Sequence, residues 1–237
     1  MKGGWCDSHI AAGATTDPYW WDAARPTLLR SNPAPPQADV VAATNGYTTK
    51  SLGWFARRVI PFQGYIAATE ELPPDLVKKL IPNRRVVIDT NTDIDFCRIA
   101  PDSSRVIIGG ATASGMSTSE AIANRLHPIM ARVLPGLAGR KFTHLWIGFC
   151  CGTFDLMPHV GGSRGLWYAM GYSFAGVTMG TYMGDKVAKQ VLGNPEGATV
   201  FSEAPFHTVP LYTGNPWFMP FVMHYFHWRD ARIAARQ

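Results

Sequence analysis

The sequence predicts a mixed α/β protein in which an antiparallel sheet is flanked by helices. Three observations support this fold class. Short β-type segments follow one another between residues 58 and 108, separated by turns rich in Asp, Asn and Ser. Residues 117–133 repeat apolar residues with the period of a helix, and a helix at 176–192 is indicated by Gly193 and Pro195 after its end. The 46% hydrophobic fraction of the 237 residues is sufficient for a packed core.

The predicted strands occupy much of the first half of the chain. A strand at 39–44 ends in the turn Asn45-Gly46, where glycine allows a positive φ angle. Consecutive strands at close spacing favour hairpins, and therefore an antiparallel sheet. One short helix is expected at 74–80, and the further strands are expected at 58–61, 64–69, 85–88, 96–99 and 105–108.

The first long helix is predicted over 117–133. Ser117 and Glu120 have the spacing of a capping box at its start. Pro128 lacks a backbone donor in the middle of this helix, so we expect a kink or a break there. The predicted apolar face consists of Ile122, Leu126, Ile129, Met130 and Val133.

The second half of the chain continues the α/β pattern. Strands at 141–149 and 166–170 lead to a helix at 176–192, and Gly193 should close that helix in a left-handed conformation.

The two ends of the chain differ from this body. Residues 1–37 are expected to form an irregular leader, because they have no sustained period and are rich in proline. Residues 194–237 form a Pro- and aromatic-rich extension, which should wrap the body as loops with a last helix near 224–236.

Composition argues against several classes of protein. The net charge of +5 comes from scattered basic residues, so no nucleic-acid surface is predicted. No apolar run approaches the length of a membrane span, and the N-terminus lacks the apolar region of a signal peptide. The four cysteines show no CxxC spacing, which favours reduced thiols and a cytoplasmic location. His224 and His227 have no evident third ligand, so no metal site is predicted.

Residues 166–180 have the pattern of a strand, a glycine loop and a helix start. A helix start presents unpaired N–H groups and a positive partial charge, so it favours an anion or an electron-rich carbonyl edge. An ordinary βα turn gives the same pattern, and on the pattern alone it is the simpler interpretation.

Several further motifs follow one another in a fixed order. The motifs are the strand end ATNGY at 43–47, Pro-x-x-x-Tyr-Ile-x-x-Thr-Glu at 61–70, the Arg-x-x-Pro-Asp-x-x-Arg hairpin leading to Gly-Gly at 98–110, Trp-x-Gly at 146–148, Asp-x-x-Pro-x-x-Gly at 155–161, and Gly-Tyr-Ser-x-x-Gly-Val at 171–177. With these motifs, residues 38–195 resemble the family of FAD-dependent oxidases and dehydrogenases that act on amines and amino acids, and most strongly its gamma-glutamylputrescine oxidase-like branch.

The resemblance implies a division into domains. Residues 38–60 would be a remnant of the FAD-binding domain, 61–140 the substrate domain, and 141–193 the C-terminal part of a Rossmann-like FAD-binding domain. The leader 1–37 and the extension 194–237 lie outside these parts, and the N-terminal βαβ unit of the FAD-binding domain would be missing.

The resemblance also implies where the cofactor would bind. The pyrimidine edge of the flavin would lie along the glycine loop, where the helix start would stabilise negative charge. The phosphate or adenosine side would lie at the end of the first strand. The implied FAD-binding residues are Thr44, Asn45, Gly46, Trp146, Gly148, Gly171, Tyr172, Ser173, Phe174, Ala175, Gly176, Val177 and Thr178.

The sequence departs from the family in its phosphate-binding segment. The fingerprint Gly-x-Gly-x-x-Gly, which holds the pyrophosphate at a helix N-terminus, does not occur in the 237 residues. The chain is therefore expected to be a truncated form of an FAD-dependent amine oxidoreductase. Such an enzyme would be active only if FAD can still bind to this chain or if a separate chain supplies the missing segment. The alternative is a non-catalytic remnant or binding module without the cofactor.

A second departure concerns the substrate. In relatives that oxidise amino acids, arginines clamp the substrate carboxylate at positions that match Cys150 and Phe174. Their replacement favours a small-molecule amine over a simple α-amino acid. Arg98 is a further candidate for binding a carboxylate, with a strand-edge charge as the alternative. His159 and Tyr172 would either face the substrate or pack behind the site, and no catalytic base is predicted.

Overall fold

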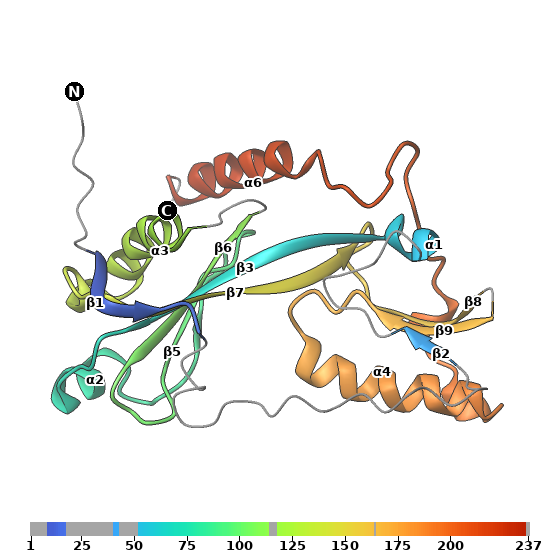
Figure 1. Ribbon diagram of the computed structural model, residues 1–237, viewed down its shortest axis with the longest axis horizontal. Coiled ribbons are helices and arrows are strands. Elements are labelled where there is room, and N and C mark those ends of the chain that lie inside the picture. Colours follow the sequence, from blue (N-terminus) through green and yellow to red (C-terminus); the bar gives the residue numbers. More distant parts are fainter. Residues whose placement is uncertain (1–8, 18–39, 43–51, 114–117, 164, 236–237) are drawn as a thin grey trace. The chain divides into compact units, whose positions relative to one another are not determined.

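The computed structural model describes residues 9–17, 40–42, 52–113, 118–163 and 165–235 (Figure 1). It has the mixed α/β architecture that the sequence predicts, with two sheets and flanking helices. The chain divides into two compact units. The first comprises Met1–Thr27, Gln63–Gly148 and Phe218–Gln237, and the second comprises Leu28–Phe62 and Phe149–Trp217.

The larger sheet has six strands, in the order β1-β7-β3-β6-β5-β4. Strands β3, β6, β5 and β4 form the predicted antiparallel part, whereas β1 is parallel to β7. The strands are β1 (Ile10–Thr15), β3 (Val59–Thr69), β4 (Val87–Ile88), β5 (Phe96–Ile99), β6 (Val106–Ala113) and β7 (Phe142–Thr153).

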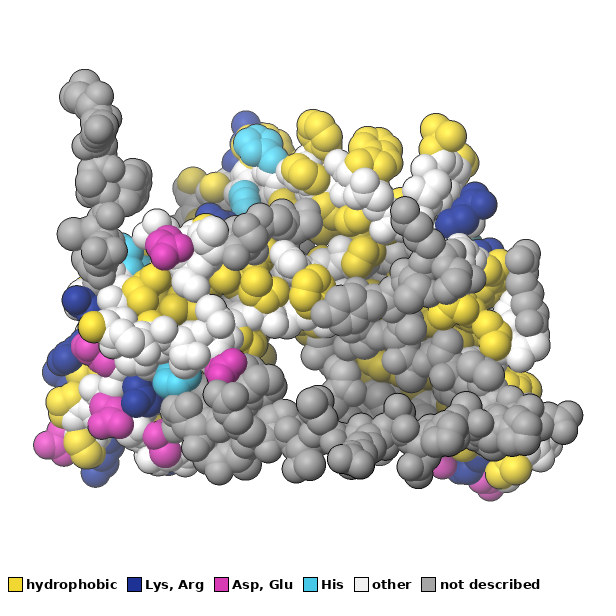
Figure 2. All heavy atoms as spheres, in the orientation of Figure 1, with side chains coloured by type: hydrophobic (Ala, Val, Ile, Leu, Met, Phe, Trp, Pro, Cys, Tyr) yellow, Lys and Arg dark blue, Asp and Glu magenta, His cyan; other side chains and the backbone are white. Residues whose placement is uncertain are grey.

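The first unit has its core between this sheet and α3 (Ser119–Val133). Leu126 and Met130 of α3 are fully buried together with Tyr65 and Phe142 of the sheet. Leu126 and Met130 are four residues apart, so both side chains lie on one face of α3, as the sequence predicts. The unit also contains α2 (Pro74–Leu80), the short 3-10 helix η4 (Pro135–Leu137) and α6 (Met219–Ala234). Hydrophobic side chains gather along α6 in the space-filling view (Figure 2).

The second unit is built on a sheet of three strands in the order β2-β9-β8. Strand β2 (Val40–Ala42) is parallel to β9 (Leu166–Met170), and β8 (His159–Ser163) is antiparallel to it. The helices are α1 (Gly53–Ala56), α4 (Gly176–Val191), η5 (Pro195–Gly197) and α5 (Val200–Glu203).

Helix α4 ends as predicted. Gly193 adopts a φ angle of 67°, and the amide of Asn194 donates to the carbonyl of Lys189 across a distance of 2.9 Å. This six-residue closure is the geometry that a glycine after the helix allows.

Helix α3 corrects two details of the prediction. Its N-cap is Thr118, whose hydroxyl accepts from the amide of Ala121, so the cap is not Ser117. Pro128 does not divide the helix, because the buried residues Leu126 and Met130 hold the chain on both sides of it in the same core cluster.

Several other elements differ from the predicted bounds. The segments 58–61 and 64–69 form one strand, β3, in which an irregularity between Gln63 and Tyr65 replaces the expected break. Strand β1 lies within the leader that was expected to be irregular. The last helix, α6, begins at Met219 rather than near 224, because Pro220 is accepted in the first turn of a helix, where no intrahelical donor is needed.

Strand β8 was not predicted, and its glycines explain why. Glycine is unfavourable in strands, so Gly161 and Gly162 lower the strand signal. In the structure they lie opposite Tyr168 and Trp167 of β9, and a β-carbon at Gly162 would approach the Trp167 ring to 3.0 Å. The glycines therefore make room for the rings of the neighbouring strand.

The described residues contain no helix with the length and apolar character required to cross a membrane. They also contain no group of three or more His, Cys, Asp or Glu side chains that could hold a metal ion. The predicted domain boundaries at 60/61 and 140/141 stay predictions. The chain passes from one compact unit to the other after Thr27, Phe62, Gly148 and Trp217.

Candidate functional site

The glycine loop of the second unit connects β9 to α4. Gly171 begins it with a φ angle of 83°, and a β-carbon there would lie 2.6 Å from Cγ2 of Thr153. Both facts require glycine, because other residues rarely adopt this φ angle and no space is left for a side chain. The loop therefore packs tightly against the end of β7.

Two further residues of the loop hold a left-handed conformation without being glycine. Ser173 has a φ angle of 44° and Phe174 one of 71°. Non-glycine residues in this region cost on the order of 1 kcal/mol or more each, and such strain concentrates at functional sites. The loop is held in place by the amide of Ser173, which donates to the carbonyl of Cys151, and by that of Ala175, which donates to the carbonyl of Tyr172.

Helix α4 starts without a side-chain cap. Its N-cap residue, Ala175, has no acceptor in its side chain, and its first turn contains no acidic residue. Val177 in this turn is 92% exposed. The start of a helix of 16 residues thus presents donors and positive partial charge that no side chain of the described residues neutralises.

The side chains of the loop point to different environments. Tyr172 is buried, and its hydroxyl donates to the carbonyl of Ala169 at 3.0 Å. Burial raises the pKa of this phenol, with Cys151 adding to the shift. Phe174 is 53% exposed and packs against Phe62, with the ring centres 5.0 Å apart. Tyr172 therefore anchors the loop, whereas Phe174 covers its outer side.

Cys150 lies beside this loop as a half-buried free thiol. Burial raises its pKa to about 11, with a further contribution from Cys151, although a hydrogen bond from the backbone of Phe174 lowers it. The thiol is therefore neutral near pH 7 and is not an activated nucleophile.

His159 is buried in a network that shapes the turn between β7 and β8. Its Nε2 lies 3.1 Å from Oδ2 of Asp155, and its ring stacks on Phe206 at 4.2 Å. Thr153 donates to Asp155 at 2.7 Å, and the amide of Met157 donates to the same carboxylate. Burial opposes ionisation of Asp155, but these hydrogen bonds and that of His159 outweigh it and lower the pKa of Asp155. His159 thus supports the turn, with 1% of its surface exposed.

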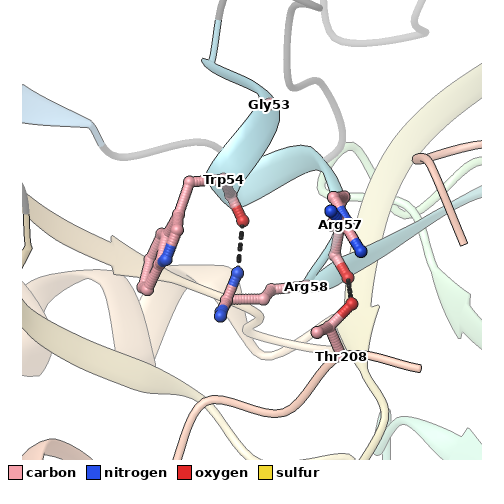
Figure 3. A pocket seen from close by; sticks show the side chains of 5 residues that line it. All are labelled: Gly53, Trp54, Arg57, Arg58 and Thr208. Atoms are coloured by element: carbon pink, nitrogen blue, oxygen red, sulfur yellow. Dashed lines mark hydrogen bonds between the residues drawn. The ribbon is translucent and has the colours of Figure 1, made fainter. Parts of the chain in front are cut away.

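A pocket at α1 was not predicted from the sequence. It has a volume of about 480 Å³ and is lined by Gly53, Trp54, Arg57, Arg58 and Thr208 (Figure 3). The Arg58 guanidinium stacks 3.8 Å from the Trp54 ring and donates to the carbonyls of Trp54 and Phe206. Among the described residues, two guanidinium groups and no carboxylate line the pocket, so its charge favours an anionic group. Arg57 and Arg58 are adjacent in the sequence, but nothing in the sequence indicates that Thr208 lies beside them.

The other predicted site residues lie in the first unit or outside the described residues. Trp146 is buried in a small cluster with Ala68, Ala100 and Ile107, and a β-carbon at Gly148 would meet nothing within 4 Å. Arg98 is exposed on β5. Thr44, Asn45 and Gly46 lie outside the described residues.

Comparison with known proteins assigns the family. The model of the FAD dependent oxidoreductase (DAO) family matches residues 23–190. The chain belongs to this family. It is 30% identical over 173 residues to gamma-glutamylputrescine oxidoreductase of Escherichia coli K12, a match that covers 72% of this chain and 40% of that protein. It is also 31% identical over 168 residues to the probable oxidoreductase OrdL of Haemophilus influenzae, covering 69% and 38%. The chain thus spans about two fifths of the length of these relatives.

Solved structures share the fold. Iminodiacetate oxidase from Chelativorans sp. BNC1 matches with a TM-score of 0.55 and 21% identity, over 75% of this chain and 46% of that one. Glycine oxidase from Geobacillus kaustophilus matches with a TM-score of 0.54 and 22% identity, over 73% and 45%. These likenesses support the mixed α/β fold of the family.

The family implies FAD, and the described loop fits one part of this cofactor. The uncapped start of α4 offers donors to an electron-rich carbonyl edge, and Gly171 lets the backbone approach a flat ligand. The sequence has no fingerprint for the pyrophosphate. The residues present therefore fit the flavin ring rather than the whole dinucleotide.

Proposed function

We propose that this protein is an FAD-dependent oxidoreductase that oxidises the C–N bond of an amine or amino-acid derivative. The family match over 23–190 carries the proposal, and the glycine loop supports it. When bound, FAD would supply the acceptor for a hydride from the carbon next to nitrogen.

The chain's own residues would act mainly by positioning and electrostatics. The free N–H groups at the start of α4 would hold the pyrimidine edge and stabilise negative charge there. Gly171 and Tyr172 would fix the loop, and the neutral Cys150 thiol would leave the substrate side without a nucleophile.

The proposed substrate is an amine. By the resemblance, Cys150 and Phe174 stand where amino-acid-oxidising relatives have arginines that bind a carboxylate. The name of the Escherichia coli relative also refers to a putrescine derivative. Arg98 and His159 stay candidates for substrate contacts, although His159 is buried in the present geometry.

A second candidate is a non-catalytic module without cofactor, which the missing phosphate fingerprint favours. For the catalytic candidate, we propose that the pyrophosphate is held by a segment outside this sequence, in the same polypeptide or in a separate chain. The affinity of this chain alone for FAD would then come from contacts with the flavin ring and not from the pyrophosphate.

Flavin binding tests the proposal directly. Titration of the protein into FAD or riboflavin, followed by flavin fluorescence, should show quenching by both ligands with similar affinity, because the ring is the shared part. A well-folded protein that quenches neither would reject the stand-alone enzyme and leave the non-catalytic module.

The Ala175→Asp variant separates the flavin site from the stability of the helix. Aspartate is a favourable N-cap, so this variant should raise the unfolding free energy by about 0.5–1 kcal/mol. The same carboxylate occupies the donors and repels an anionic flavin edge, so flavin affinity should fall by about tenfold. Leu192→Asp is the matched control, because it adds the same charge at the exposed far end of α4. Equal affinities for the two variants would contradict the assignment of the α4 start.

Chemistry is tested by anaerobic mixing of the flavin-loaded protein with putrescine derivatives and secondary amines. Loss of the flavin's visible absorption is expected with an amine and not with simple α-amino acids. Reduction by α-amino acids alone would overturn the substrate class but leave the oxidoreductase assignment intact.

A further inference from the structure

Helix α6 has its polar side turned toward the rest of the first unit. Asp230 accepts from both the amide and the hydroxyl of Thr92 at 2.9 Å. His227 lies 2.9 Å from the carboxylate of Asp93, and Arg229 donates to Thr92. These contacts fix the rotation of the helix about its axis.

The opposite side of α6 is aromatic and exposed. Phe221, Tyr225 and Trp228 are 73%, 52% and 48% exposed. Their spacing of four and three residues places them on one stripe, and Trp228 lies about half a turn away from Asp230. Figure 2 shows hydrophobic side chains gathered along this helix. Large aromatic side chains are usually buried, so three exposed rings on one stripe indicate a surface that contacts a partner.

The charge around this stripe is positive. Arg232 continues the stripe, and its guanidinium lies 4.4 Å from the Trp228 ring. Arg229 is held on the body side by its bond to Thr92. Asp230 is the only acidic residue of α6, and it is bonded to Thr92 on the same side. The outward stripe thus combines aromatic rings with the Arg232 guanidinium and contains no carboxylate of the helix.

We propose that the outward stripe of α6, formed by Phe221, Tyr225, Trp228 and Arg232, binds the surface of an anionic lipid bilayer. Tyrosine and tryptophan rings with adjacent arginines are the side chains that favour the boundary between headgroups and acyl chains. The positive rim is complementary to anionic headgroups.

The size of the stripe favours lipid over a protein partner. Taking about 200 Å² for each aromatic side chain, the exposed fractions amount to roughly 350 Å². A stable protein interface buries about 800 Å² on each partner. A helix lying in the headgroup region needs no such area, because attraction to anionic lipids adds to the burial of the rings.

Vesicle sedimentation of the full chain tests this proposal. The protein should sediment with vesicles of phosphatidylcholine and phosphatidylglycerol, and at least about tenfold less with pure phosphatidylcholine. Trp228→Ser and Phe221→Ser should each reduce binding by about tenfold. Arg232→Gln should weaken binding to the anionic vesicles and reduce its dependence on salt. Val200→Ser is the control, because it removes a side chain of 69% exposure from the second unit.

Two results would overturn the proposal. One is equal sedimentation of the parent protein, the α6 variants and the control. The other is a concentration-dependent dimer in size-exclusion chromatography that Trp228→Ser abolishes while vesicle binding is absent, since the stripe would then bind a second copy of the chain. All substituted side chains are exposed, so circular dichroism should show an unchanged fold for each variant.

Discussion

The two compact units of this chain differ in the apolar clusters that stabilise each of them. The first has a large apolar cluster in which α3 packs on the sheet, and Leu126, Met130 and Phe142 are fully buried in it. The second has two smaller clusters, one around Phe55 and Val59 and the other around α4. Hydrogen bonds between distant segments occur in both units. Thr92 donates to Asp230 in the first unit. In the second unit, where the apolar clusters are smaller, Arg58 donates to the Phe206 carbonyl and Tyr212 to that of Val59.

This difference fits the proposed function, in which the glycine loop of the second unit holds the flavin ring. Apolar burial is strong and non-directional, so it suits a unit whose main requirement is a stable frame. Hydrogen bonds fix geometry more than they add stability, so they suit a unit whose loop must keep a set shape. The strained Ser173 and Phe174 belong to this loop of the second unit.

Cavity-forming substitutions should show the contrast most strongly. Leu126→Ala should lower the unfolding free energy by about 3–4 kcal/mol, because the large cluster cannot collapse around the cavity. Met183→Ala of α4 should cost about 2–3 kcal/mol, since its smaller cluster has more freedom to relax. Urea denaturation measures both values. The exposed Leu192→Ala should stay within about 0.5 kcal/mol of the parent protein. Equal costs at Leu126 and Met183 would remove the distinction between the clusters.

Loss of one buried hydrogen bond in the second unit should lower the unfolding free energy by less than a cavity does, but by more than an exposed substitution does. The buried Tyr212 hydroxyl donates to the Val59 carbonyl at 2.7 Å, and burial raises the pKa of this phenol, with a further contribution from Cys151. Tyr212→Phe leaves that carbonyl without its donor and should lower the unfolding free energy by about 1–2 kcal/mol in urea denaturation. Tyr225→Phe, at a 52% exposed position, should change it little. If Tyr212→Phe leaves the unfolding free energy unchanged, the second unit does not depend on this hydrogen bond.

Acidification should affect the first unit through a stacked histidine pair. The ring centres of His9 and His127 lie 3.7 Å apart. Burial, together with the charge of His9, lowers the pKa of His127, although a hydrogen bond to the backbone of Arg140 opposes this shift. A histidine with a lowered pKa binds fewer protons in the folded state than in the unfolded state. The unfolding free energy should therefore decrease as the pH falls from about 6.5 through the lower folded pKa of His127.

His127→Phe should flatten this pH dependence, because the ring can still stack while the titrating group is gone. His207→Phe, at an exposed histidine of the second unit, should leave it unchanged. Urea denaturation between about pH 5 and pH 8 measures the slope. An unaltered slope in His127→Phe would assign the acid sensitivity to other groups, such as Asp155.

Local patterns predicted the elements whose signals lie within one segment. The apolar spacing around Leu126, the strand 166–170 and the glycine after α4 all matched the structure. Strand β8 was not predicted because its glycines are explained only by a neighbouring strand. Gly161 and Gly162 are typical of loops, and their place in a strand becomes clear only when Tyr168 and Trp167 are known to lie opposite them. The N-cap of α3 was placed one residue early, since Ser117 and Thr118 offer equivalent hydroxyl groups.

The candidate site shows the same limit. The glycine loop was predicted as a unit because strand, loop and helix are continuous in sequence. The pocket at α1 was not, because the Thr208 hydroxyl reaches the Arg57 carbonyl across 151 positions of sequence. Positive φ angles at Ser173 and Phe174 were also beyond prediction, since neither residue type favours them and only the surrounding contacts impose them.

The neutral thiol beside the glycine loop has a practical consequence for redox measurements. With a pKa of about 11, only about one Cys150 side chain in ten thousand is a thiolate at pH 7. Cys97 and Cys151 are buried, and burial raises the pKa of Cys97 as well. These three sulfur atoms should therefore resist air oxidation and alkylation during purification. A protein in which the remaining cysteine, Cys6, is changed to serine could be stored and assayed without dithiothreitol, so that electrons reaching the flavin come from the amine under study.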